Sequence, residues 1–594
     1  MTMNASGRAA GILTRASRVG LFALILTACT GPSPAAEQPV NGGAATARPN
    51  SLTIGITSSV PAMSLAVATG TPTGGWMAMM ELHTDGLVTA DANSRTPVGR
   101  LAESVPTLEN GGITILPDGR MKVVFNLRPN VTWQDGMPLT ADDMVFSYQI
   151  GGPSGIPTPL NGAVPYMSSV DAVDAHTLAV YYKSPFFQGA VLGPQMFWPF
   201  PQHLLGAAYQ KYLADKNLEE LLGDSYWTSG YVSAGPFRLT QFDPGGDLTF
   251  EAYPGYYLGP PKISTVHVRV FRDVNALFAS VIAGAVDAIP DLALQGETGA
   301  QLKRMWDASG DGNAYAIEGA WRRYDPQYRP EYQIEPTVLD RRVRVALYQA
   351  LNREDISDAA NGGSPELASN SLLARSDPLY EATKDDLAPF GYNPARSRAL
   401  LQEAGWVYGP DGSLRFGRDG RPFKTAIYTA VGNERDIAAS ASYWRQLGIE
   451  VEEHIWSASE TRDAAVRAQY PGFDGTGGGI LNLLFQRAAT AQNNWVGNRT
   501  GYENVDGQRL VQTLRSSIST SDQLKAMRDV SDFFVADLPI LPVYYLATYL
   551  FARKGVLALT PGDVAGGVSD NPTLYAYGTF SRNAYLWDVA SIGS

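Results

Sequence analysis

The stretch NLRPNVTWQDGMPLTADDMVFS, residues 126–147, places two adjacent carboxylates after a turn. Thr140 stands three residues before Asp143, which is the spacing of a capping box with Asp in place of the usual Glu. Asp142 and Asp143 then fall in the first helical turn, where unpaired N–H groups and the positive end of the dipole favour acids. Neighbouring residues on a helix do not face each other. The pair therefore predicts the start of a helix and not a catalytic pair.

The rest of the chain alternates between strand and helix signals. Runs rich in β-branched and aromatic residues predict strands at 52–57, 121–127, 177–182, 247–253, 265–271 and 425–431. Apolar residues at helical spacing predict helices at 340–352 and 394–405. Asp-Gly pairs at 118–119 and 411–412 predict hairpin turns. We expect a mixed α/β fold, in a chain of 594 residues that is long enough for two or three domains.

The charge balance is acidic. The chain has 46 Lys and Arg against 58 Asp and Glu, which gives a formal net charge of -12. Nucleic-acid binding needs clustered basic side chains that replace counterions on phosphates. The composition therefore predicts no nucleic-acid partner.

The N-terminus resembles a bacterial lipoprotein signal. Arg8, Arg15 and Arg18 precede an apolar run at 19–26, which is too short for a permanent membrane span, and the residues LTAC follow. In such signals the cysteine becomes the lipidated first residue, and Cys29 is the only cysteine of the chain. The alternative is an ordinary cleaved signal with an incidental cysteine.

We therefore expect a signal peptide at 1–28 and a flexible tether, rich in Pro, Gly and Ala, at 29–50. A lipid on Cys29 would hold the protein on the outer side of the cytoplasmic membrane. The mature chain would then contain no disulfide and no thiol nucleophile.

The segment 126–147 also resembles a signature of the family 5 extracytoplasmic solute-binding proteins, the peptide, nickel and oligosaccharide receptors of ABC importers. Other blocks that resemble the family follow in its order, and together they span residues 52 to about 550. They are TDGLVTAD with PVGRLAES (97–104), SAGPFRLTQFDPG (233–245), YPGYYLGPP (253–261), VIAGAVDA (281–288), DRRVRVALYQALNREDI (340–356), YNPARSRALLQEAGW (392–406) and LPILPVYY (538–545).

The resemblance implies a three-lobed fold of the type II periplasmic-binding-protein kind, with the ligand enclosed between two lobes. The lobes implied are a first at 51–83, 227–320 and 549–594, a second at 84–226, and a third at 321–548. Crossing strands near 320–324 and 545–548 would form the hinge, because closure of such receptors is driven by ligand contacts to both lobes.

The implied function is capture of a peptide-like or other small solute and its delivery to the permease of an ABC importer, by a monomer without a cofactor. Enzyme motifs such as GxSxG, GxxxxGK and HExxH are absent from the sequence, and its five histidines are scattered singly. The chain is therefore predicted not to be an enzyme. The alternative is a lipid-tethered secreted hydrolase acting on peptides or glycans, whose catalytic carboxylates would come from distant segments.

Aromatic residues are one class of candidate ligand contacts. Trp76, Trp321, Tyr324 and Trp495 lie in loops or hinge-like segments and not on helical stripes. Such rings accept ligands by stacking and apolar contact. The alternative for each ring is packing in a core.

The family resemblance also bears on ligand charge. Many of its peptide receptors hold the ligand's ammonium with an aspartate in the loop after a Tyr-Asp strand. Here no acidic residue stands between Asp474 and Glu503. We therefore expect a ligand without an essential free amino terminus, with Asp474 as the alternative ammonium anchor.

The same segment offers other contacts. Gly478 and Gly479 would let the backbone approach a ligand closely, and Arg487 and Asn494 would donate hydrogen bonds. These four residues complete the predicted ligand site.

One segment fits a calcium-loop pattern. Asp307, Ser309, Asp311 and Glu318 take positions 1, 3, 5 and 12 of such a loop. The favoured interpretation is a helix-to-strand turn around Asp311 and Gly312, so no metal site is predicted.

Overall fold

The computed structural model describes residues 50–590 except 58–59, 61, 64–73, 93, 95, 153–155, 157–161, 376, 479–485 and 561–579. The predicted signal peptide and the lipidation site Cys29 lie outside the described residues, as does the tether except for its last residue.

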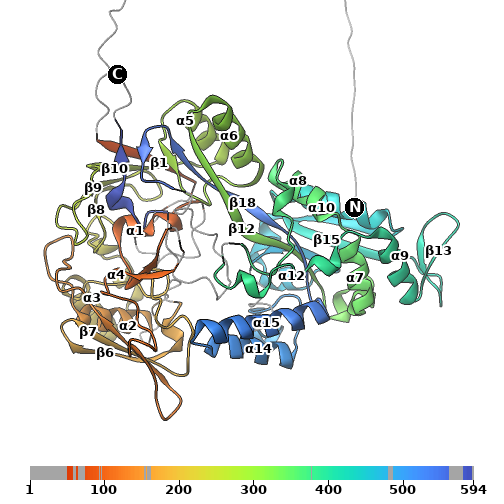
Figure 1. The fold of residues 1–594 in the computed structure, drawn as a ribbon, viewed down its shortest axis with the longest axis horizontal. Helices are drawn as coiled ribbons and strands as arrows, with labels where there is room; N and C mark the ends of the chain where they lie inside the picture. Colours follow the sequence, from red (N-terminus) through yellow and green to blue (C-terminus); the bar gives the residue numbers. More distant parts are fainter. Residues whose placement is uncertain are drawn as a thin grey trace, which may run out of the picture. The chain divides into compact units, whose positions relative to one another are not determined.

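Two long antiparallel strands, β12 (Gly312–Pro326) and β18 (Leu541–Arg553), lie side by side in the middle of the largest sheet (Figure 1). Strands from 424–477 continue the sheet beyond β12, and strands from 51–289 continue it beyond β18. The pair thus joins two groups of strands that come from different parts of the sequence.

Counted over the described residues, this sheet has ten strands. Their order is β16 (Glu450–Trp456), β15 (Lys424–Ala430), β17 (Phe473–Gly477), β12, β18, β11 (Ala288–Ile289), β1 (Ser51–Ile56), β10 (Thr265–Val270), β9 (Leu248–Ala252) and β8 (Phe237–Phe242). β1 pairs in parallel with β10 and β11, and β15 pairs in parallel with β16 and β17. Each group therefore contains a parallel core, whose carboxyl edge is the usual place for a ligand in an open α/β sheet.

The smaller sheets are antiparallel. They are the four-stranded sheet β4 (Ile113–Ile115), β5 (Met121–Asn126), β7 (Thr177–Tyr182) and β6 (Met167–Asp174), and the pairs β2 (Val88–Ala90) with β3 (Pro97–Gly99), β13 (Trp406–Tyr408) with β14 (Leu414–Phe416), and β19 (Val556–Leu557) with β20 (Asp588–Val589). The predicted Asp-Gly turns connect β4 to β5 and β13 to β14, with positive φ at Gly119 and Gly412. The predicted strands and the mixed α/β class are confirmed.

Within the described residues, the α-helices are α1 (Met80–His83), α2 (Ala141–Gly151), α3 (Gln202–Asp215), α4 (Leu218–Leu222), α5 (Val274–Ile282), α6 (Gly296–Ser309), α7 (Arg341–Gln349), α8 (Arg353–Asn361), α9 (Pro394–Glu403), α10 (Glu434–Arg445), α11 (Ala458–Arg462), α12 (Ala464–Ala468), α14 (Val505–Ser516) and α15 (Thr520–Asp537). The helices predicted at 340–352 and 394–405 are α7 and α9. No helix within the described ranges is long and apolar enough to cross a membrane.

The opening stretch forms the predicted helix start. In α2 the Thr140 backbone N–H donates to Asp143 Oδ2 at 2.9 Å, which is one half of the capping box. Asp143 is 5% exposed, whereas Asp142 faces solvent. The two carboxylates thus point to different environments, as expected for a helix start.

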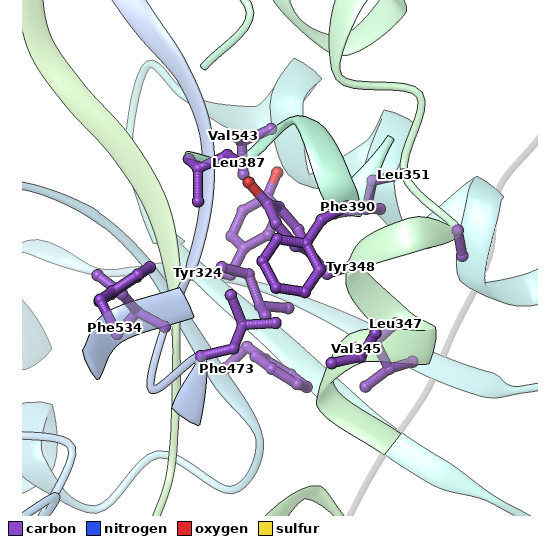
Figure 2. Packing of buried hydrophobic residues seen from close by; sticks show 14 of the residues in the cluster. Tyr324, Val345, Leu347, Tyr348, Leu351, Leu387, Phe390, Phe473, Phe534 and Val543 are labelled. Atoms are coloured by element: carbon purple, nitrogen blue, oxygen red, sulfur yellow. The ribbon is translucent and has the colours of Figure 1, made fainter. Parts of the chain in front are cut away.

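The buried apolar side chains gather in separate clusters. One cluster takes all its buried members from Trp321 to Tyr545, and Figure 2 shows Tyr324, Phe473, Phe534 and Val543 packed within it. These residues fall within the segment 321–548, which is the expected third lobe. A second cluster combines strands of the expected first lobe with α3 of the expected second lobe, so the lobe boundaries stay predictions.

Candidate functional site

A cavity of about 810 Å³ borders the central strand pair. Tyr544 and Leu546 of β18 line it, together with the first turns of α6 and α10. Thr57, which follows β1, and Val431, which follows β15, also lie in its wall. The cavity therefore occupies the carboxyl edges of both parallel strand groups, where open α/β sheets bind ligands.

The cavity wall is acidic. Among the described residues of the wall, Glu297 of α6 and Glu434 and Asp436 of α10 are acidic and Arg435 is basic. The Glu434 carboxylate accepts hydrogen bonds from the backbone N–H of Gly432 at 2.9 and 3.1 Å. Arg435 forms an ion pair with Glu297 and so links α10 to α6 across the cavity. The remaining acid, Asp436, has a different surrounding.

Asp436 is a buried carboxylate, only 1% exposed. Its Oδ2 accepts hydrogen bonds from Arg322 Nη2 at 3.0 Å and from the Tyr544 hydroxyl at 2.9 Å. Burial and then the charge of Asp436 raise the pKa of Tyr544, so the hydroxyl keeps its proton and donates it. The other oxygen, Oδ1, is buried and has no hydrogen-bond partner in the part of the chain that is described.

Arg322 lies where the pairing of β12 with β18 is irregular. The register shifts between Glu318 and Trp321, and again between Arg322 and Arg323. Extra residues of this kind bend a strand locally. The irregularity falls on the segment 320–324, where a hinge was expected. Arg322, which lies in this segment, donates the hydrogen bond to Asp436 in the cavity wall.

Asp474, a predicted ligand contact, lies inside β17 and is 1% exposed. Its Oδ2 accepts hydrogen bonds from Arg467 Nη2 at 3.1 Å and Arg499 Nη2 at 3.2 Å. Its Oδ1 accepts one from Trp456 Nε1 at 3.0 Å. The charge of Asp474 is thus balanced inside the protein, and its contact with a ligand stays a prediction.

Three predicted aromatic contacts are also interior. Trp76 and Tyr324 are each 1% exposed and Trp321 is 5% exposed. Trp76 stacks on His83 with ring centroids 5.5 Å apart, and Trp321 Nε1 donates to Ser369 Oγ at 2.8 Å. None of the three belongs to the wall of the described cavity. For these rings the alternative of core packing fits the structure better than ligand contact.

The predicted glycine and arginine contacts lie after β17. Gly478 has a φ of 114°, a conformation that favours glycine, and its carbonyl accepts a hydrogen bond from Arg323. Gly479 lies outside the described residues. Arg487 is exposed to solvent. Their contact with a ligand stays a prediction.

Asn494 and Trp495 form a tight turn with positive φ values of 54° and 59°. The Trp495 ring is half-buried, and the Arg329 guanidinium lies 6.0 Å from its centroid. One face of this indole is thus occupied by a cation of the protein. The role of both residues toward a ligand also stays a prediction.

The calcium-loop candidate at 307–318 is a connection from helix to strand. α6 ends at Ser309, Gly310 follows with a φ of 71°, and β12 begins at Gly312. Ser309 Oγ donates to Asp311 Oδ2 at 2.6 Å and so holds the turn. The favoured interpretation as a helix-to-strand turn is confirmed.

The two end carboxylates of that segment have partners of their own. Lys303 Nζ lies 2.6 Å from Asp307 Oδ2. Glu318 lies within β12, where Arg375 binds it and burial raises its pKa. Over the described chain, no group of three or more His, Cys, Asp or Glu side chains is placed to hold a metal ion.

Sequence reasoning did not identify Asp436, Arg322 or Tyr544. Asp436 stands in the first turn of a helix, where an acid is expected without any ligand. Arg322 and Tyr544 meet because they are cross-strand partners in the central pair. The register of two strands far apart in the sequence cannot be read from a single sequence.

Residues 96–480 match the family described as bacterial extracellular solute-binding proteins, family 5 Middle. The match covers more than half of the chain, and the chain belongs to this family. The resemblance found in the sequence is thereby confirmed.

Curated and solved relatives agree with this assignment. Oligopeptide-binding protein AppA of Bacillus subtilis (strain 168) is 27% identical over 366 residues, which are 60% of this chain and 61% of AppA. The matched part is thus less than two thirds of that relative.

Solved structures with the same fold cover nearly all of this chain. The oligopeptide-binding protein of Thermus thermophilus, complexed with a pentapeptide, has a TM-score of 0.68 at 23% identity over 91% of this chain and 97% of that chain. NikZ of Campylobacter jejuni, complexed with Ni(L-His), has a TM-score of 0.65 at 18% identity over 91% and 99%. At these identities the likeness establishes the fold alone.

Proposed function

We propose that the protein is the substrate-binding component of an ABC importer, which captures a peptide-like or other small solute and delivers it to the permease. The observation that carries the proposal is the cavity of about 810 Å³ between α6 and α10, beside the strands that join the two groups of the large sheet. Ligand pockets for solutes of peptide or drug size have volumes of roughly 300–1,000 Å³.

The relatives support a solute of this class. The Thermus protein was solved with a pentapeptide, and NikZ with a nickel–histidine complex. In our proposal this chain acts as a monomer without a cofactor and binds its solute without converting it.

Native mass spectrometry of the protein purified from its host tests this function. We expect a small solute that co-purifies with the protein and has an unchanged mass after prolonged incubation with it. A fragmented solute would instead support the alternative of a hydrolase on a lipid tether.

The proposal includes closure about a hinge. Contacts of one ligand with α6 and α10 favour the closed state, because a ligand shifts an equilibrium by its differential affinity for the two states. The register shifts on either side of Trp321 and Arg322 supply a place for bending. Small-angle scattering with the co-purified solute removed and restored should show compaction on binding, and an unchanged radius of gyration would contradict a hinge.

The proposal also includes a lipid anchor on Cys29. Cys29→Ala is expected to release the protein from membranes without changing its unfolding temperature, because acyl chains supply the attachment and the Pro/Gly/Ala-rich tether is not expected to contribute to a core. Membrane fractionation and thermal unfolding measure the two effects. A variant that still sediments with membranes after signal cleavage would exclude the lipoprotein assignment.

A further inference from the structure

We propose that the end of α14 and the turn after it, residues 515–518, form a latch that holds the molecule closed by contact with the segment 166–187. The proposal rests on the closure about a hinge that the proposed function includes, because it names a contact that the open state loses. It also gives a role in closure to the segment 84–226, which is the expected second lobe.

The tip of the hairpin formed by α14 and α15 contacts a part of the chain that is distant in sequence. The backbone N–H of Phe187 donates a hydrogen bond to the carbonyl oxygen of Arg515 at 2.9 Å. Ile518 packs against a cluster of buried apolar side chains that come from residues 87–234. The buried apolar side chains of α14 and α15 themselves belong to the cluster of residues 321–545. The tip therefore connects two separate clusters of the fold.

Aromatic rings form the surface that receives the tip. Phe186 and Phe187 are buried, and Tyr166 stacks on Phe186 with ring centroids 4.3 Å apart. Burial lowers the pKa of Arg515, and the nearby Tyr166 acts on this pKa in the opposite direction. Aromatic rings supply a large apolar contact area. The contact thus combines apolar packing with a hydrogen bond.

The base of the same hairpin is fixed to the central strand pair. Residues 538–540 connect the end of α15 to the start of β18. The guanidinium of Arg344, a buried side chain of α7, donates to the carbonyl oxygens of Asp537 and Leu538 at 2.8 and 3.0 Å. Hydrogen bonds from a charged donor are among the stronger ones in proteins. The hairpin therefore moves with the start of β18 as one body.

The length of the hairpin turns a small rotation at the hinge into a large displacement of the tip. α15 has 18 residues, and a helix of this size is about 27 Å long. A rotation of about 10° at β18 would move a tip at this distance by about 5 Å. Such a displacement breaks the hydrogen bond between Arg515 and Phe187. Because the open state lacks the contact, its free energy favours the closed state.

Hydrogen exchange followed by mass spectrometry, together with small-angle scattering, tests the latch on the protein as purified from its host. Ile518→Ser removes the apolar contact of the tip, and Tyr166→Ser removes a ring from the receiving surface. In each variant we expect the peptide 185–190 to exchange about tenfold faster than in the wild type, which is the effect of losing one partly buried apolar side chain. We also expect a larger radius of gyration, whereas peptides of β18 should exchange at the wild-type rate.

Val505→Ser is the matched control. Val505 lies at the other end of α14 and is 81% exposed. The same kind of truncation on the same helix should therefore leave both the exchange of the peptide 185–190 and the radius of gyration at their wild-type values.

The outcomes separate the latch from a local contact. Faster exchange of the peptide 185–190 with an unchanged radius of gyration would overturn the latch, and so would exchange at the wild-type rate in both variants. If Ile518→Ser also accelerates exchange in β18, that variant has loosened the fold, and Tyr166→Ser, which changes an exposed ring, decides alone.

Failure of the proposed function would be seen in a different measurement. A wild-type protein without any co-purified solute in its native mass spectrum would count against solute capture. The exchange and scattering of the variants would still decide whether the tip holds the molecule closed.

Discussion

Asp474 and Asp436 are two buried carboxylates of the same region, and they differ in how their charge is balanced. Asp474 has three donors on its two oxygens, two of them guanidinium groups. Asp436 has one guanidinium and one hydroxyl, both on Oδ2. Only Asp436 lines the cavity. Burial of an acid alone is thus not a sign of a binding site.

The strongest test of this comparison is Asp474→Ala. The variant leaves Arg467 and Arg499 without their shared carboxylate, and breaking a buried ion pair costs about 3–5 kcal/mol. Urea unfolding followed by circular dichroism measures the loss. The matched control Asp142→Ala changes an exposed acid and should stay within about 0.5 kcal/mol of the wild type. A loss below about 1 kcal/mol for Asp474→Ala would mean that this carboxylate does not balance the two guanidiniums.

A buried base gives the next largest effect. Burial lowers the pKa of His83 to about 3, while an unfolded chain has it near 6.5. Between these values only the unfolded state binds the proton, so stability falls as the pH is lowered from 6.5 toward 3, by about 1.4 kcal/mol per unit. From pH 6.5 to 4.5 this contribution is about 2–3 kcal/mol, and His83→Phe should remove it.

The raised pKa of Asp85 changes the pH dependence of stability in the opposite direction from that of His83, which gives a second variant for the same experiment. Burial raises its pKa to about 6, above the ordinary 3.8, so between these values only the folded state binds the proton. Lowering the pH therefore stabilises the fold through Asp85 and destabilises the fold through His83. Urea unfolding at pH 6.5 and 4.5 should show a smaller acid loss in His83→Phe and a larger one in Asp85→Asn. Identical pH dependence in all three proteins would contradict the buried, neutral His83.

The smallest effect is expected at the rim of the cavity. The side chains of Arg435 and Glu297 are 64% and 49% exposed, and such ion pairs contribute about 0–1 kcal/mol. Glu297→Gln should change the free energy of unfolding by less than about 1 kcal/mol, and the difference should vanish near 1 M salt because exposed charges are screened. A larger, salt-independent loss would show that the rim is as important for folding as the interior.

Much of the fold could be predicted from the sequence, because local signals decide it. The capping box at Thr140 and the Asp-Gly turns at Gly119 and Gly412 depend on residues within one turn. The sequence blocks that resemble the family are of the same local kind.

The site was harder to predict for a physical reason. Trp76 and Tyr324 are residue types that often contact ligands. Their burial in this fold depends on neighbours that are far away in the sequence. The surroundings of Asp436 depend on Arg322 and Tyr544, which strand pairing brings to one of its oxygens. Contacts of this range follow from tertiary packing and leave no pattern in residue spacing.

A crystal structure of the protein purified from its host with its solute tests the central claim most directly. We predict ligand density in the cavity that is lined by the first turns of α6 and α10. Density for a ligand that binds elsewhere in the molecule would contradict this claim.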